Sequence, residues 1–181
     1  MTEIKRNSKG ELVFDDHPEF KPNLSPEQIF SMGSFGGTYW RPIYSAVAEK
    51  NYKNKHHEFD FLSNIYENKL TRDVRDLSIN KYKVNSGTTL EFWESKGWIH
   101  KQDPYGWVQW YCRFYVGRRT VDDERQIKRW LAFTGPNGRF KKELINKINK
   151  LGSTHDDYDI SPVIRQGLQH WGYKLKKHDL N

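Results

Sequence analysis

The stretch from Asp103 to Arg119, DPYGWVQWYCRFYVGRR, constrains the fold of this chain more than any other. Asp103 can accept hydrogen bonds from the free N–H groups of a first helical turn, and Pro104 is tolerated at the first helical position. Gly117 suits the left-handed residue that ends a helix, and the arginines after it suit the helix's negative end. Together the two ends predict one helix over residues 103–117.

The apolar residues within this stretch follow the spacing of a helix. Aromatic residues recur at i, i+3, i+4 and i+7 and share one face: Trp107, Trp110, Tyr111 and Phe114. Other apolar residues extend around the side and leave a narrow polar strip at Gln109 and Arg113. A helix that is apolar almost all round belongs in a core, so we expect it to be the central helix of the fold. A strand is the alternative, since aromatic residues also favour sheets.

The rest of the chain predicts further short helices. Hydroxyl residues or prolines start them, glycines end several of them, and apolar side chains recur at helical spacing. The expected helices cover about 25–32, 88–96, 120–134, 139–151 and 161–171, with a short strand at 80–84. We therefore expect a mainly α fold of five or six short helices packed around residues 103–117, with a minor β component. Residues 1–24 are expected to form a polar N-terminal arm, and residues 25–181 a single globular helical domain.

Composition limits the class of protein. The chain has 181 residues, of which 35% are hydrophobic and 15% aromatic, enough to bury one core built largely from rings. The single cysteine, Cys112, excludes an internal disulfide and a cysteine-based zinc site. The sequence has no apolar run long enough to span a bilayer and starts without a leader peptide. We expect a soluble protein of a reducing compartment, cytoplasmic or nuclear, with no membrane partner and no cofactor.

The charge of the chain is unevenly distributed. The net charge is +7, and residues 1–60 carry −1 of it while residues 61–120 and 121–181 carry +4 each. The basic residues concentrate around two neighbouring helix starts: Arg118, Arg119, Arg125, Arg129, Arg139, Lys141 and Lys142. Such a cluster can neutralise several phosphates of a nucleic acid. In the alternative, the lysines solvate a helix face and the arginines pair with the local acids, Asp122, Asp123 and Glu124.

A glycine-rich stretch at residues 33–45, GSFGGTYWRPIYS, allows another group to approach its backbone closely. In one interpretation, its N–H groups hold a phosphate, while Tyr39, Trp40 and Arg41 beside it bind bases. In the other, it is a tight turn that lets Phe35 and Trp40 pack. The spacing matches neither the Walker A loop nor the dinucleotide-binding pattern, so both interpretations stay open.

No residue pattern specifies a reaction. Adjacent side chains on a helix do not share a face, so His56 and His57 predict a surface pair rather than a metal site. Cys112 is expected to fill the core. His100 and His170 are possible general bases, although a single histidine on a packed helix is more often hydrogen-bonded structure.

Arg113 is the most informative polar residue of the central helix. A guanidinium group on a buried helix must find a carboxylate or a bound anion. The expected structural partners are Glu91, Glu94 and Asp123. The alternative is the phosphate of a substrate.

Several blocks of this sequence resemble an uncharacterised family of small Trp/Tyr-rich proteins from bacteria, plants and fungi. They are GSFGGTYWRPIYS, TTLEFWESKGWI, DPYGWVQWYCRFYVGRR with DDERQIKRW, and SPVIRQGLQHWGY. The resemblance covers about residues 28–174. It implies a single compact domain and a soluble protein, and it carries no activity.

These features lead to one functional hypothesis and two alternatives. We expect a nucleic-acid-binding accessory protein that holds phosphates through the region Arg118–Lys142, with aromatic stacking near Tyr39 and Trp40. The first alternative is a small enzyme on a nucleic-acid or phosphorylated substrate, with Arg113 and the Gly33–Gly37 loop at its pocket. The second is a protein-interaction module that uses exposed aromatic residues. The sequence leaves the oligomeric state open.

Overall fold

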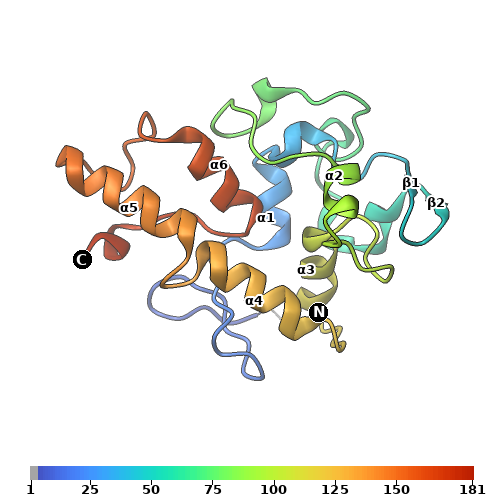
Figure 1. Ribbon diagram of the computed structural model, residues 1–181, viewed down its shortest axis with the longest axis horizontal. Coiled ribbons are helices and arrows are strands. Elements are labelled where there is room, and N and C mark those ends of the chain that lie inside the picture. Colours follow the sequence, from blue (N-terminus) through green and yellow to red (C-terminus); the bar gives the residue numbers. More distant parts are fainter. Residues whose placement is uncertain (1–3) are drawn as a thin grey trace. The chain divides into compact units, whose positions relative to one another are not determined.

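The computed structural model describes residues 4–181 as mainly helical, with one small sheet. The chain divides into two compact units. The terminal unit contains the described part of Met1–Ser25 together with Arg119–Asn181, and the middle unit contains Pro26–Arg118. The expectation of a mainly α fold with a minor β component is confirmed (Figure 1).

The middle unit holds three short helices and one β-hairpin. Its helices are α1, Pro26–Ser31, α2, Leu90–Ser95, and α3, Trp107–Tyr115. Its antiparallel strands are β1, Ile43–Ser45, and β2, Lys50–Tyr52, with Ile43 opposite Tyr52. Short 3₁₀ turns cover Ser34–Gly37, Lys55–Glu58, Asp60–Leu62, Glu67–Lys69 and Leu77–Ile79.

Helix α3 lies in the interior, as its aromatic pattern predicts. Trp110, Tyr111 and Cys112 are each 0% exposed, and α3 packs against α1. Removing side chains of this size from water stabilises a fold by about 1.5–3 kcal/mol each. Even Gln109 on the predicted polar strip is buried, because its Oε1 accepts a hydrogen bond of 3.0 Å from the N–H of Tyr105.

The expected helix over residues 103–117 is too long at both ends. Helix α3 begins only at Trp107, and Asp103–Gly106 forms a turn closed by the N–H of Gly106 donating to the carbonyl oxygen of Asp103. The side chain of Asp103 is occupied by arginines, so it does not cap the helix. Gly106, with a φ of 98°, makes the left-handed turn into the helix.

A cluster of rings fills the core of the middle unit. Trp40 is 0% exposed and lies between Tyr39, Phe59 and Tyr105, with ring centroids 5.0, 5.7 and 5.1 Å away. Phe30 of α1 closes the cluster at 5.8 Å from Trp40. Tilted and edge-on ring pairs at these separations add to the stabilisation from area burial.

The terminal unit is built from three longer helices. They are α4, Asp123–Thr134, α5, Arg139–Leu151, and α6, Pro162–His170, followed by a 3₁₀ turn at Lys177–Leu180. Within this unit α5 packs against both α4 and α6 (Figure 1). Its inner face supplies Leu144 and Ile148 to a core shared with Leu168 and Leu175.

Residues 4–25 are packed within the terminal unit. Phe20 is fully buried and meets Trp130 of α4 edge-on, with ring centroids 5.2 Å apart. Leu12 is also buried, and its N–H donates to the carbonyl oxygen of Pro22 at 2.8 Å. The expected N-terminal arm therefore contributes core side chains from residue 12 onward, while its residues 1–3 lie outside the described part of the chain.

The strand expected at 80–84 is absent from the described residues, where turns replace it. The side chain of Asn80 bonds both backbone groups of Val84, donating to its carbonyl oxygen at 2.8 Å and accepting from its N–H at 3.2 Å. These bonds close a loop and leave no extended ladder. Across residues 4–181, none of the helices has the length and apolar composition to cross a membrane.

Candidate functional site

The residues expected to bind phosphate lie in both units. Arg118, Arg113, Tyr39, Trp40 and Arg41 belong to the middle unit, and Arg119, Arg125, Arg129, Arg139, Lys141 and Lys142 belong to the terminal unit.

In the middle unit, Arg113 and Arg118 converge on one buried carboxylate. Asp103 is 0% exposed, and its Oδ1 accepts from Arg113 Nη1 at 2.9 Å and from Arg118 Nη1 at 2.8 Å. Arg113 also donates from Nε and Nη2 to both oxygens of Glu58, at 2.6 and 2.7 Å. The carboxylate that Arg113 requires is thus supplied by Glu58 and Asp103, and neither was among the expected partners. Glu94 instead accepts from the N–H of Ala46 at 2.7 Å.

Burial and ion pairing act in opposite directions on the pKa values of Glu58 and Arg113. Burial acts to raise the pKa of Glu58, but the hydrogen bonds and charge of Arg113 outweigh it, so the pKa lies below its usual value. Burial likewise acts to lower the pKa of Arg113, and Glu58 and Asp103 raise it. Glu58 and Arg113 are therefore charged at neutral pH, and together with Asp103 they form a structural ion-pair network.

In the terminal unit, two of the expected arginines hold nearby acids. Arg119 Nε donates to Asp16 Oδ2 at 2.6 Å, and Arg125 donates to both oxygens of Asp122 at 2.5 and 2.9 Å. Asp122 immediately precedes α4, so this is the local pairing of Arg125 that the acidic residues at the helix start suggested.

The other arginines of this set lie on aromatic rings. The guanidinium of Arg129 lies 5.4 Å from the ring centroid of Trp171, and that of Arg139 lies 5.1 and 5.0 Å from Phe133 and Phe140. Such contacts stabilise by about 0.5–1 kcal/mol at exposed sites. Arg129 Nη1 also donates to Gln126 Oε1 at 2.8 Å.

The two lysines at the start of α5 differ sharply in environment. Lys141 Nζ lies 2.8 Å from Asp179 Oδ1 and 3.0 Å from the hydroxyl of Tyr173, and the side chains of Lys141 and Asp179 are only 13% and 4% exposed. Burial opposes ionisation of Asp179, but Lys141 and nearby donors lower its pKa. Lys142 is exposed. Lys141 thus belongs to the packed interior of the terminal unit.

The residues expected to stack on bases are not open to solvent. Tyr39 is 4% exposed and Trp40 is 0% exposed. The hydroxyl of Tyr39 accepts the N–H of Gln109 at 3.0 Å, and burial raises the pKa of that hydroxyl. Their rings are core elements, as the packing interpretation of the glycine-rich stretch predicted.

The glycines of residues 33–37 are approached by the chain itself. A Cβ at Gly33 would lie 2.0 Å from the carbonyl oxygen of Ile79, and one at Gly36 would lie 2.9 Å from the N–H nitrogen of Asp76. The N–H of Asp76 donates to the carbonyl oxygen of Gly36 at 3.0 Å. The close approach that the glycines permit is therefore made by residues 67–80.

Beside this loop the middle unit has a recess of about 190 Å³. Its aromatic walls are Phe35, Tyr39, Trp93 and Tyr105, its basic groups are Arg41 and Arg75, and its acidic groups are Asp73 and Glu91. Trp93, half-buried on α2, offers the ring that is most accessible. Burial raises the pKa of Tyr105 to about 12, so its hydroxyl stays protonated and donates to the carbonyl oxygen of Arg41 at 2.9 Å.

Arg41 and Arg75 are unusual among the arginines of the middle unit. Arg72, Arg113 and Arg118 each pair with a carboxylate. Within residues 4–181, Arg41 donates to the carbonyl oxygen of Thr38 at 3.1 Å and Arg75 donates to the side chain of Asn85, and neither has a carboxylate partner. Both arginines line the recess. Burial lowers the pKa of Arg75, and the charge of Arg41 lowers it further.

The side chains considered as nucleophile or general base lie elsewhere. Cys112 is 0% exposed, and burial raises the pKa of its thiol, so it fills the core. His100 Nδ1 accepts the N–H of Gln102 at 3.2 Å, and His170 Nε2 lies 3.0 Å from Gln166 Nε2. Among the described residues that line the recess, none is a cysteine or histidine.

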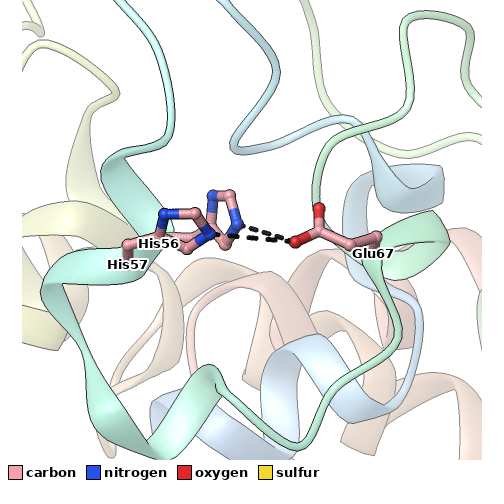
Figure 2. A group of neighbouring side chains, drawn as sticks. All are labelled: His56, His57 and Glu67. Atoms are coloured by element: carbon pink, nitrogen blue, oxygen red, sulfur yellow. Dashed lines mark hydrogen bonds and ion pairs between the residues drawn. The ribbon is translucent and has the colours of Figure 1, made fainter.

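The histidine pair differs from its expected surface position. His56 is buried, at 4% exposed, while His57 is exposed. Both imidazole rings are directed toward the same carboxylate, Glu67 (Figure 2). The expectation of a surface pair was wrong for His56, and the two adjacent rings converge because their Nε2 atoms both face Glu67 Oε1.

Sequence reasoning missed Arg75, Trp93 and Glu67. Arg75 and Glu67 lie in a region without helical periodicity, and the side chains of Asn85 and His56 that they contact are 10 and 11 positions away. The sequence clue to Arg75 was Gly36, since a glycine allows another group to approach the backbone closely. That group is the aliphatic part of the Arg75 side chain, whose Cγ would lie 2.3 Å from a Cβ at Gly36.

Comparison with known proteins adds no relative from which a function can be carried over. No family model, no curated protein and no solved structure matches the chain.

Proposed function

We propose that this protein binds a phosphorylated ligand of the nucleotide class in the recess beside residues 33–37, with the phosphate between Arg41 and Arg75. The observation that supports the proposal is that two guanidinium groups line one recess and form no ion pair with a carboxylate among residues 4–181. Two like charges held together are unfavourable until an anion lies between them. The planar guanidinium fork suits phosphate oxygens because it donates two parallel hydrogen bonds.

The other lining groups suit the remainder of such a ligand. Trp93 supplies an accessible ring face, and stacking of a base on an aromatic ring stabilises binding by about 1–3 kcal/mol. Asp73 and Glu91 can accept hydrogen bonds from sugar hydroxyl groups. These carboxylates also disfavour a ligand that carries only negative charge.

The size of the recess limits what enters it. Pockets that enclose a whole small molecule have volumes of about 300–1,000 Å³, and this recess has about 190 Å³. It therefore admits a phosphate and the group attached to it, while the rest of a larger ligand stays outside. A mononucleotide or the terminal nucleotide of a strand fits this requirement.

Calorimetric titration of the full chain with adenosine monophosphate, adenosine and inorganic phosphate tests the proposal. We expect binding of adenosine monophosphate to be tightest, and to weaken about 10- to 100-fold in R41Q and in R75Q, since a hydrogen bond to a charged group contributes about 1.5–3 kcal/mol. R72Q is the matched control, because Arg72 pairs with Asp76 at 3.3 Å. Equal affinity in R41Q, R75Q and R72Q, or no binding at low salt, would overturn the proposal.

A further inference from the structure

Two histidines and one glutamate of the middle unit meet at a single point. His56 Nε2 lies 3.0 Å from Glu67 Oε1, and His57 Nε2 lies 3.9 Å from the same oxygen. One ligand atom from each residue falls within 4.8 Å of the others. Figure 2 shows the two imidazole rings side by side, with the Glu67 carboxylate facing them.

The local backbone brings these groups together. The 3₁₀ turn Lys55–Glu58 follows Asn54, whose left-handed φ of 56° redirects the chain just before the two histidines. Glu67 opens the turn Glu67–Lys69. Thr71 holds the carboxylate in place, because its hydroxyl donates to Glu67 Oε2 at 2.8 Å and leaves Oε1 toward the rings.

The donor set matches a borderline divalent metal ion. Imidazole nitrogen and carboxylate oxygen are both ligands of Zn²⁺, at distances of about 2.0–2.2 Å. Such bonds place tetrahedral ligand atoms about 3.3–3.5 Å apart, and the two measured separations of 3.0 and 3.9 Å bracket this value.

We propose that His56 Nε2, His57 Nε2 and Glu67 Oε1 form a Zn²⁺-binding site. Its three protein ligands leave a fourth position open to solvent, because the side chains of His57 and Glu67 are 67% and 66% exposed. Three protein ligands with an open position characterise zinc sites that bind water or an exogenous ligand. The site is separate from the recess, and its proposal does not depend on the ligand proposed there.

The surroundings of His56 limit the affinity. Metal-bound histidines normally donate their second ring N–H to an acceptor, and loss of such a partner costs about 10- to 100-fold in affinity. Within the described chain, His56 Nδ1 is buried without a partner. The site therefore binds Zn²⁺ more weakly than one with a complete outer shell, and it exchanges metal readily.

Calorimetric titration of the untagged full chain with ZnCl₂ tests the site. We expect one Zn²⁺ per chain with binding weakened at least tenfold in H57A and in E67Q. Both replaced side chains are exposed, so the variants should keep the fold, and thermal unfolding without metal checks this. H17A is the matched control, because His17 Nδ1 lies 3.6 Å from Glu19 on the surface of the terminal unit.

Two further measurements distinguish this site from surface adsorption. Co²⁺ should give visible absorption of a nitrogen- and oxygen-ligated ion that disappears in H57A, and MgCl₂ should give no binding at these residues because Mg²⁺ requires oxygen ligands. Stoichiometric binding that survives both H57A and E67Q would overturn the proposal. So would the absence of saturable Zn²⁺ binding by the unmodified chain.

Discussion

Arg113 and Glu58 lie 55 positions apart in the sequence and form a bidentate ion pair, with nitrogen-to-oxygen distances of 2.6 and 2.7 Å. The pair joins helix α3 to the turn that carries His56 and His57. Because Arg113 also holds the buried Asp103, one guanidinium fixes three segments of the middle unit.

E58Q should destabilise the protein at neutral pH and lose that effect in acid. The pKa of Glu58 in the folded state lies below its usual value of 4.5. Its ionised form therefore stabilises the fold above that value, and the stabilisation disappears as the pH falls through the lower, folded-state pKa. We expect E58Q to lower the free energy of unfolding by about 1 kcal/mol at pH 7, a value that allows for solvent screening of a partly exposed pair.

Urea unfolding of E58Q and the parent chain between pH 7 and pH 3 checks this. E124Q is the control, since Glu124 and Lys128 form a pair that is 78% and 71% exposed. A difference between E58Q and the parent that stays constant across the pH range would contradict the assignment.

Gly33→Ala should destabilise more than Gly97→Ala. Both glycines have a φ of +68°, so both variants carry the same left-handed backbone strain of about 1–2 kcal/mol. A Cβ at Gly97 meets nothing within 4 Å, whereas one at Gly33 would lie 2.0 Å from the carbonyl oxygen of Ile79. The resulting overpacking should destabilise Gly33→Ala by about a further 1–3 kcal/mol. Chemical denaturation of the two variants measures the excess, and equal losses would show that residues 67–80 can move away from the loop.

K141A should destabilise the protein by about 3–5 kcal/mol, because it leaves the buried carboxylate of Asp179 without its cation. K142A, one residue along the same helix and exposed, should change the free energy of unfolding by less than about 0.5 kcal/mol. Thermal or urea unfolding compares the two variants. A similar effect of both substitutions would mean that the ion pair with Asp179 contributes little.

Nucleic-acid binding by the terminal unit remains a prediction with a direct test. If its cations contact phosphates, the affinity for single- or double-stranded oligonucleotides falls steeply with salt. Reversing charge in the R125E/R129E variant should then remove binding. Fluorescence anisotropy at several salt concentrations measures both effects, and K128A, which replaces another exposed cation on the same helix, is the control. Undiminished binding by R125E/R129E would exclude these arginines.

Local sequence signals predicted the helices well where the chain is regular. The helix expected over residues 139–151 is α5, Arg139–Leu151, because a turn precedes it and Gly152 adopts a left-handed φ of 61° after it. A hydroxyl residue starts α2 as expected: Thr89 caps it, its hydroxyl accepting the N–H of Phe92 at 3.2 Å. Phe92 on this helix is 40% exposed.

Contacts between distant residues escaped prediction. The start of α3 was misplaced because Asp103 resembles a helix cap, and the sequence gives no sign that Arg118 would occupy it. The partners of Arg113 were sought among nearby acids, whereas Glu58 lies in an irregular region whose fold depends on tertiary contacts. Arg75 and Glu67 escaped notice for the same reason.

The segment of residues 67–80 has consequences for how this protein can vary. It rests on glycines that tolerate no added side chain, and it presents Glu67 at one end and Arg75 near the other. An insertion or a proteolytic cut inside it would shift both groups at once, although they serve different proposed ligands. Homologues in which the length of this segment differs should therefore lose the proposed Zn²⁺ binding and the proposed nucleotide binding together. Changes in the turn Ala46–Glu49 should affect neither kind of binding.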